Sequence, residues 1–161
     1  MRIEEKIGMM LRGTGKTLSV AESCTGGQIS HLLTMVSGSS NYYLGSVTSY
    51  AVAVKEKVLN VPDDIVERCG VVSSEVAAAM AEGVRKLTGS TYAISTTGLA
   101  EGGDSNYPEG TVWIAVASEQ QTWTRMYQCN LGRKGNIRRF AEVALSTFFN
   151  LCLSSGSSKM I

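Results

Sequence analysis

The stretch TLSVAESCTGGQISHLLTMV (Thr17–Val36) decides how the chain folds. Its first residues, Thr17–Ala21, are apolar and β-branched, which predicts a short buried strand. The polar, glycine-rich run Glu22–Gly27 follows, and the apolar spacing beyond it predicts a helix that reaches about Val36. The stretch therefore predicts a strand, a turn and a helix, the unit from which α/β proteins are built.

The rest of the chain alternates helices and strands around this unit. Helices are expected at residues 2–12, 54–60, 63–70, 73–88 and 136–153, and strands at 42–53, 92–96, 111–118 and 122–129. With no repeat and no linker, this order predicts the α/β fold class: a single domain, a three-layer α/β/α sandwich with a mixed β-sheet. We expect the domain to occupy residues 1–153, and residues 154–161 to form a disordered or frayed tail.

Charge and hydropathy exclude several kinds of partner. The 15 Lys and Arg and 14 Asp and Glu residues leave a net charge of +1, which gives no general attraction for nucleic acid or an anionic membrane. The apolar runs are shorter than the roughly 20 residues that cross a bilayer, and Glu4, Glu5 and Lys6 stand where a secretory signal would begin its apolar run. We expect a cytoplasmic protein that binds neither nucleic acid directly nor a membrane. The sequence does not decide whether the chain forms homo-oligomers, which are possible.

Cysteine and histidine usage argues against a metal centre. The four cysteines (Cys24, Cys69, Cys129 and Cys152) form no CxxC pair, and His31 is the only histidine. We therefore expect no metal and no cofactor. Cys24 could act as a thiolate nucleophile at a helix end, but with no histidine partner a packed small side chain is favoured.

Ligands of such sheets bind where loops converge beyond the strand ends, which directs attention to the loops after Ala21, before Tyr42 and after Thr97. In the first loop, glycine allows close approach of a phosphate, and the hydroxyls of Ser23 and Thr25 can donate to an anion. The same hydroxyls can equally well cap the helix. Spacing alone leaves both interpretations open.

A serine, a tyrosine and a lysine surround the second predicted strand. Ser39 and Ser40 precede it, and Tyr50 and Lys55 come at its far end. A serine nucleophile needs a base, and a lysine can serve only when desolvation or neighbouring positive charge lowers its pKa. Composition alone makes the serines turn residues, Tyr50 a half-buried strand residue and Lys55 a solvated helix residue.

Five ordered blocks together resemble the C-terminal domain of the CinA competence/damage-inducible protein family. The blocks are SVAESCTGG (Ser19–Gly27), GSSNYYLGSVTSYAVAVKEKVLNV (Gly38–Val61), GVVSSEVAAAMAEGV (Gly70–Val84), TTGLAEGG (Thr96–Gly103) and PEGTVWIAVA (Pro108–Ala117). AESCTGG is the most specific of these motifs, and the likeness covers about residues 5 to 150. Members of the family resemble nicotinamide-nucleotide amidases, which convert nicotinamide mononucleotide and water to nicotinic acid mononucleotide and ammonia.

The resemblance implies a three-layer α/β/α fold, an amidohydrolase activity without a metal, and a set of site residues. It implies that Ser40 is the catalytic serine, Lys55 its general base and Tyr50 the residue that orients the lysine or relays a proton. The implied substrate-binding residues are Ser23, Thr25, Gly26, Gly27, Thr97, Gly98, Lys134 and Arg138. This hypothesis requires the Ser40 hydroxyl and an uncharged Lys55 amine to meet beside the first glycine turn.

The sequence departs from the family pattern at three places. Val52 stands where the family usually has Asn, Glu101 replaces a glycine in the GxAGPxGG loop and no proline follows it, and Tyr107 replaces a basic residue. A carboxylate beside a phosphate would repel it or change which substrate is preferred. The alternative function is therefore a catalytically weak nucleotide-binding or protein-interaction domain linked to competence or the DNA-damage response.

Overall fold

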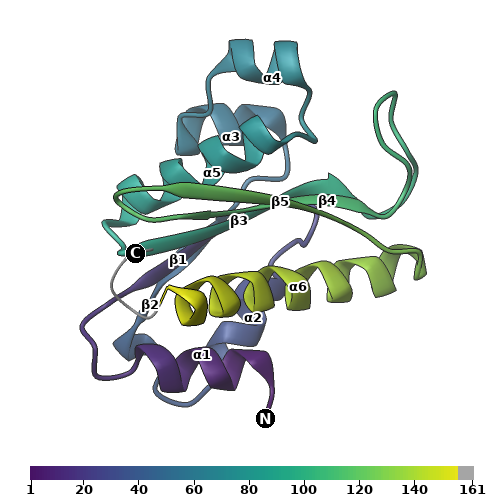
Figure 1. Ribbon diagram of the computed structural model, residues 1–161. Helices are drawn as coiled ribbons and strands as arrows, with labels where there is room; N and C mark the ends of the chain where they lie inside the picture. The colour runs from purple at the N-terminus through teal and green to yellow at the C-terminus, as the bar shows by residue number, and fades with distance from the viewer. Residues whose placement is uncertain (156–161) are drawn as a thin grey trace.

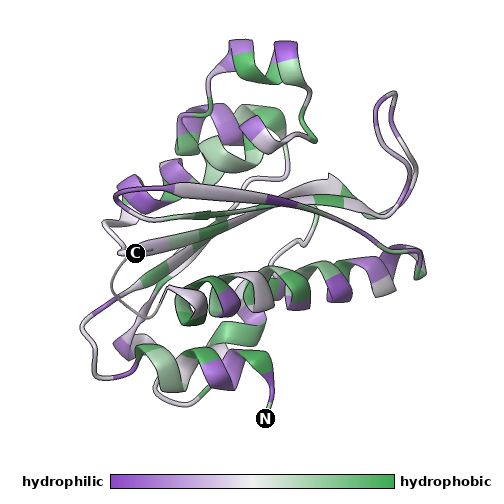
Figure 2. Ribbon diagram, viewed as in Figure 1, coloured by the Kyte–Doolittle hydropathy of each residue, from purple (hydrophilic) through white to green (hydrophobic). Residues whose placement is uncertain are grey.

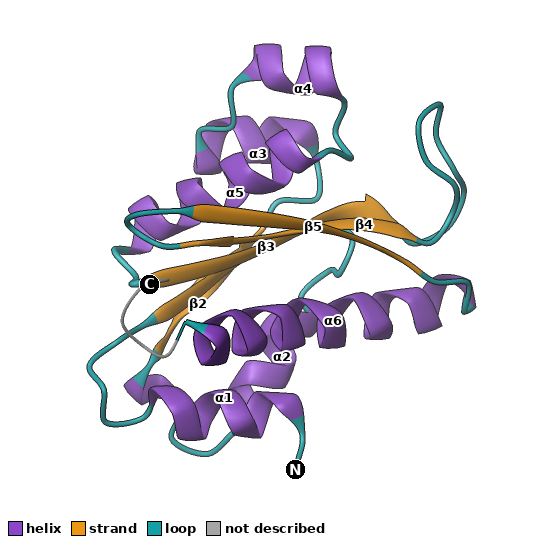
Figure 3. Ribbon diagram, in the orientation of Figure 1, coloured by secondary structure: helices purple, strands orange, loops and turns teal. Residues whose placement is uncertain are grey.

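A five-stranded mixed sheet forms the centre of the computed structural model, which describes residues 1–155 (Figure 3). The strands are β1 (Leu18–Glu22), β2 (Tyr43–Thr48), β3 (Tyr92–Leu99), β4 (Thr111–Ala117) and β5 (Thr122–Gln128), in the spatial order β2-β1-β3-β4-β5. β1 runs parallel to both β2 and β3, whereas β4 and β5 are antiparallel to their neighbours. The segments that follow β1, β2 and β3 therefore leave the sheet at the same edge.

Helices cover both faces of the sheet and complete three layers (Figure 1). One layer holds α1 (Ile3–Leu11), α2 (Gln28–Thr34) and α6 (Gly132–Ser154); the other holds α3 (Val52–Leu59), α4 (Asp63–Cys69) and α5 (Ser74–Thr88). A 3₁₀ turn, η1 (Ser39–Asn41), precedes β2. The predicted α/β/α sandwich with a mixed sheet is confirmed.

Successive side chains of a strand point to opposite faces of the sheet, so the core has two halves, one on each face. Leu18 and Val20 point from β1 into the half packed with α1, α2 and α6, and Ala21 points into the half packed with α3 and α5. Along α6, apolar residues alternate with polar ones at helical spacing (Figure 2). Phe140 and Phe148 on this helix are fully buried. The alternation along β1 continues into the residues that follow it, which determines the layout of the site.

Three expected boundaries move. The second strand ends at Thr48 rather than 53, because its partner β1 ends at Glu22, opposite Thr48, and α3 begins at Val52. The third strand continues to Leu99, and the last helix begins at Gly132 rather than 136. Ser154 is the last residue of α6, and most of the predicted tail, residues 156–161, lies outside the described residues.

Among the helices of residues 1–155, none combines the length and apolarity needed to span a membrane.

Candidate active site

Two consecutive residues at the end of β1 point to opposite faces of the sheet. Glu22 follows Val20 toward α2, and Ser23 follows Ala21 toward α3 and α5. Beyond them the chain turns sharply, with Gly26 at φ 60° and Gly27 at φ 103°. Such positive φ values suit glycine, so this turn requires the Gly26–Gly27 pair.

The buried carboxylate of Glu22 caps the N-terminus of α2. It accepts hydrogen bonds from the backbone N–H groups of Gly27 and Ile29, each at 3.1 Å, and of Ser30 at 2.9 Å. The hydroxyls of Thr25 and Ser30 add two more at 2.6 Å. Of the two interpretations left open for this turn, a phosphate site or a helix cap, the position at the end of α2 is filled by a carboxylate of the chain itself.

Lys55 reaches Ser23 from the first turns of α3. Its side chain is fully buried, and its Nζ lies 2.9 Å from Ser23 Oγ. Nζ also donates to the carbonyl oxygens of Ser49 at 2.6 Å and Tyr50 at 3.2 Å. A neutral amine has two N–H donors and one lone pair; with both donors on carbonyls, the lone pair faces the Ser23 hydroxyl. This is the arrangement of a nucleophile and its general base.

Burial acts on the two titratable side chains of this region in opposite senses. Desolvation lowers the pKa of Lys55 below the ordinary lysine value, because the buried ammonium loses its hydration. Desolvation also raises the pKa of Cys24 to about 12, although the charge of Lys55 opposes the shift. Burial thus shifts Lys55 toward the uncharged amine and keeps the Cys24 thiol protonated, so Cys24 is a packed side chain.

The structure does not bring Ser40 to Lys55. Ser40 lies exposed in η1, before β2 begins, whereas Lys55 lies in α3, after β2 ends. The six residues of β2 separate the two by roughly 20 Å at about 3.3 Å per residue. Ser40 therefore cannot pass its proton to Lys55, and the loop before Tyr42 lies at the opposite edge of the sheet from the glycine turn.

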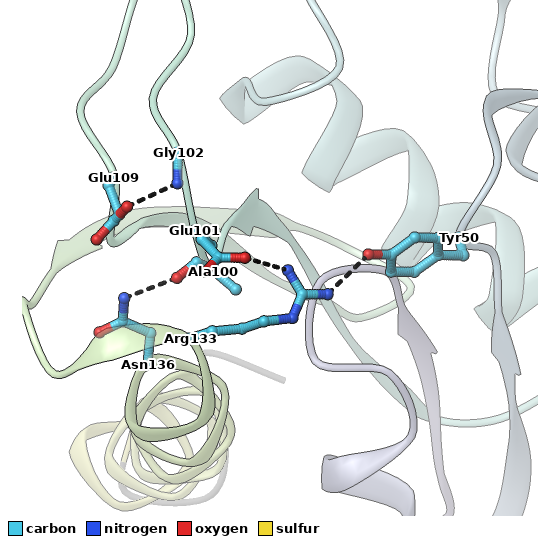
Figure 4. A network of polar contacts seen from close by, with 7 residues as sticks. All are labelled: Tyr50, Ala100, Glu101, Gly102, Glu109, Arg133 and Asn136. Atoms are coloured by element: carbon cyan, nitrogen blue, oxygen red, sulfur yellow. Dashed lines mark hydrogen bonds and ion pairs between the residues drawn. The ribbon is translucent and has the colours of Figure 1, made fainter.

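Tyr50 touches the lysine through its backbone rather than through its hydroxyl. Its carbonyl accepts from Lys55, while its side chain is 63% exposed and its hydroxyl accepts from the Arg133 guanidinium at 3.2 Å. Arg133 also forms an ion pair with Glu101, with Nη1 and Oε1 3.6 Å apart (Figure 4). We call these three side chains the arginine bridge.

The remaining predicted residues have structural contacts or lie at the surface. Thr97 is buried and donates to the Val71 carbonyl at 2.9 Å. Gly98 lies against β4, where an added Cβ would stand 2.5 Å from the Thr111 oxygen, so close strand packing explains this glycine. Lys134 and Arg138 are exposed on the first turns of α6. Residues 1–155 contain no group of three or more His, Cys, Asp or Glu side chains placed to hold a metal.

Sequence reasoning placed Ser23 in a nucleotide-facing loop and missed its contact with the lysine. It also missed the capping role of Glu22 and the part that Arg133 and Asn136 play at the start of α6. The period of β1 was a usable signal, since it places Ser23 on the same face as Ala21. For the arginine bridge, the sequence holds no such signal, because its three residues lie far apart in the chain.

Together, the fold and the site define a three-layer α/β/α domain with a buried serine–lysine pair beside a glycine turn. A sequence profile described as the CinA C-terminal domain matches residues 1–152. The chain belongs to this family.

Relatives and solved structures agree with this assignment. A CinA-like protein of Salinibacter ruber is 46% identical over 145 residues, covering 89% of this chain and 35% of that protein. One of Cytophaga hutchinsonii is 41% identical over 146 residues, with the same coverage. The chain thus spans about a third of the length of these relatives. The crystal structure of a CinA-superfamily protein from Klebsiella pneumoniae superposes with a TM-score of 0.91 at 26% identity, covering 95% of this chain and 96% of that one.

Proposed function

We propose that this domain is an amidohydrolase that converts nicotinamide mononucleotide and water to nicotinic acid mononucleotide and ammonia, with Ser23 as nucleophile and Lys55 as general base. The observation that carries the proposal is the 2.9 Å contact between Ser23 Oγ and the Nζ of a fully buried lysine. The choice of substrate rests on the resemblance to nicotinamide-nucleotide amidases. Ser23 replaces Ser40 in the role expected for the catalytic serine.

In the first half of the reaction, Ser23 Oγ attacks the carboxamide carbon and Lys55 Nζ takes the hydroxyl proton. The backbone N–H groups of Cys24 and Thr25, which donate to no carbonyl among the loop and turn hydrogen bonds of residues 1–155, are the candidate donors for the tetrahedral oxyanion. The C–N bond then breaks, and Lys55 returns the proton to the leaving nitrogen, which departs as ammonia. An ester between Ser23 and the nicotinoyl group remains.

In the second half, water attacks the ester carbon while Lys55 accepts a proton from it. The bond from carbon to Ser23 Oγ breaks, Lys55 returns the proton to Oγ, and the carboxylic acid leaves. The carbonyls of Ser49 and Tyr50 hold Nζ in place through both halves. Because these acceptors belong to the backbone, the orientation of the base does not depend on the Tyr50 hydroxyl.

An ammonia-release assay on purified protein tests the proposal, with Ser40→Ala as the matched control for Ser23→Ala. We expect Ser23→Ala to reduce kcat by about a thousandfold or more, and Ser40→Ala to change it by less than about twofold. Loss of activity in Ser40→Ala with activity retained in Ser23→Ala would overturn the assignment. A wild-type protein that binds the mononucleotide but releases no ammonia would instead favour a nucleotide-binding domain.

A further inference from the structure

The arginine bridge lies across the end of the strand that carries the nucleophile. Tyr50 follows β2 and Glu101 follows β3, and β1 lies between these two strands in the sheet. Arg133 contacts both residues, so its guanidinium links the segment after β2 to the segment after β3 (Figure 4). These two segments flank the end of β1, after which Ser23 begins the turn. The length of one tyrosine side chain separates Arg133 from the Tyr50 carbonyl that holds Lys55.

Buried contacts fix the parts of the chain that carry the arginine bridge. Asn136 is fully buried, and its Nδ2 donates to the Ala100 carbonyl at 2.9 Å, which ties the segment after β3 to the first turns of α6. Glu109 accepts from the Gly102 N–H at 2.7 Å and closes the base of the loop. Glu101 lies between these two anchors, so its carboxylate is held near Arg133 by the backbone on both sides.

Arg133 keeps hydrogen-bonding capacity for a ligand. A guanidinium has five N–H donors; one bonds the Tyr50 hydroxyl, and the 3.6 Å separation from Glu101 is an ion pair beyond hydrogen-bond distance. Its side chain is 48% exposed. The other helix end at this edge, that of α2, is occupied by Glu22. Of the three basic residues Arg133, Lys134 and Arg138 at the start of α6, Arg133 is the one whose contacts within residues 1–155 reach the segments after β2 and β3. This makes it the candidate cation for a phosphate near Ser23, and Glu101 competes for the same group.

We propose that Arg133 binds the phosphate of a nucleotide amide whose carboxamide lies at Ser23, and that Glu101 weakens this contact by competing for the guanidinium. The pair then determines how strongly the site prefers a phosphorylated over an unphosphorylated amide. The inference rests on the proposed function, because it takes Ser23 as the reacting group. Arg133 and Glu101 are specificity-determining residues, since neither contacts Ser23 or Lys55.

The test compares kcat/KM for nicotinamide mononucleotide with kcat/KM for nicotinamide riboside, two amides that differ by the phosphate. Arg133→Gln should lower this ratio about tenfold, because a charge-assisted contact to the phosphate is lost. Glu101→Gln should raise it about threefold, as expected for an exposed ion pair, and the effect should shrink at high salt. In the Arg133→Gln background, Glu101→Gln should have no further effect on the ratio.

Arg139→Gln is the matched control. Arg139 lies on the same helix and also contacts a tyrosine hydroxyl and a glutamate, Tyr127 and Glu142, but its partners lie on β5 and α6. Its substitution should leave the ratio unchanged. A ratio unaffected by Arg133→Gln, or lowered equally by Arg139→Gln, overturns the proposal.

Binding to Ser23→Ala protein separates this inference from the proposed function. In that background, which does not turn over, Arg133→Gln should weaken calorimetric binding of the mononucleotide about tenfold. If wild type releases no ammonia and this weakening is still seen, the amidase proposal fails and the phosphate site stands. If wild type is active and binding is unchanged by Arg133→Gln, the phosphate site fails and the amidase proposal stands.

Discussion

Replacing Glu22 with glutamine tests whether this carboxylate holds the glycine turn together. The carboxylate is fully buried and accepts five hydrogen bonds, three on Oε1 and two on Oε2. A glutamine amide fits best in the place of Oε2, since the Ser30 hydroxyl can rotate to accept while the three donors around Oε1 keep an oxygen. The Ser30 N–H then faces an NH₂ group and loses its acceptor.

The magnitude follows from these contacts. A buried N–H without an acceptor costs about 1–3 kcal/mol, and loss of the negative charge at the N-terminus of α2 costs about 1 kcal/mol more. Three bonds to Oε1 weaken as their acceptor becomes neutral, while removal of a buried charge offsets part of the loss. We expect Glu22→Gln to lower the free energy of unfolding by about 3 kcal/mol.

Urea denaturation followed by tryptophan fluorescence measures this change. Glu75→Gln is the matched control, because Glu75 also lies in the first turn of a helix but is exposed; its loss should stay below about 1 kcal/mol. A loss below about 1 kcal/mol in Glu22→Gln, equal to that of the control, would refute the capping role. The N-terminus of α2 would then again be open to a substrate anion.

Three further outcomes are expected. Burial lowers the pKa of Lys55 in the folded chain. At pH values between this lowered pKa and the usual lysine pKa of about 10.4, Lys55 therefore carries a proton in the unfolded chain but not in the folded one. Unfolding free energy should thus rise with pH across this window in wild type but not in Lys55→Met, as urea titrations at several pH values will measure. Asn136→Ala should cost about 2–4 kcal/mol in thermal denaturation, because it removes the partner of the Ala100 carbonyl and leaves the Leu131 N–H without its acceptor. Cys24→Ala should keep ammonia release within about threefold of wild type, since a thiol with a pKa near 12 supplies no thiolate at neutral pH; a larger loss would revive a cysteine mechanism.

The fold could be predicted because local patterns determine it. The apolar run of β1, the glycine turn and the amphipathic pattern of α6 each specify one element, and their alternation specifies the layers. The end of β2 was placed too late because residues 49–53 continue the β-branched and aromatic character of the strand. The strand stops there because its partner β1 ends at Glu22, opposite Thr48, and α3 begins at Val52.

The site could be predicted only in part, because its contacts join distant segments. Lys55 was identified as the candidate base, and burial supplies the desolvation that this role needs. A meeting of Ser40 and Lys55 was expected because they are near in sequence, but the strand between them sends them to opposite edges of the sheet. Nearness in sequence is a poor guide across a strand, since each residue adds about 3.3 Å.

The end of β1 explains why neighbouring residues there have unrelated roles. The strand period turns Glu22 toward α2, where five N–H and O–H donors of the turn and helix surround it, and turns Ser23 toward α3. Inserting or removing one residue in β1 would exchange the two faces and leave a carboxylate against Lys55 and a hydroxyl at the end of α2. The register of β1 between β2 and β3 thus couples the stability of the turn to the position of Ser23, so substitutions that shift the strand should disturb both together.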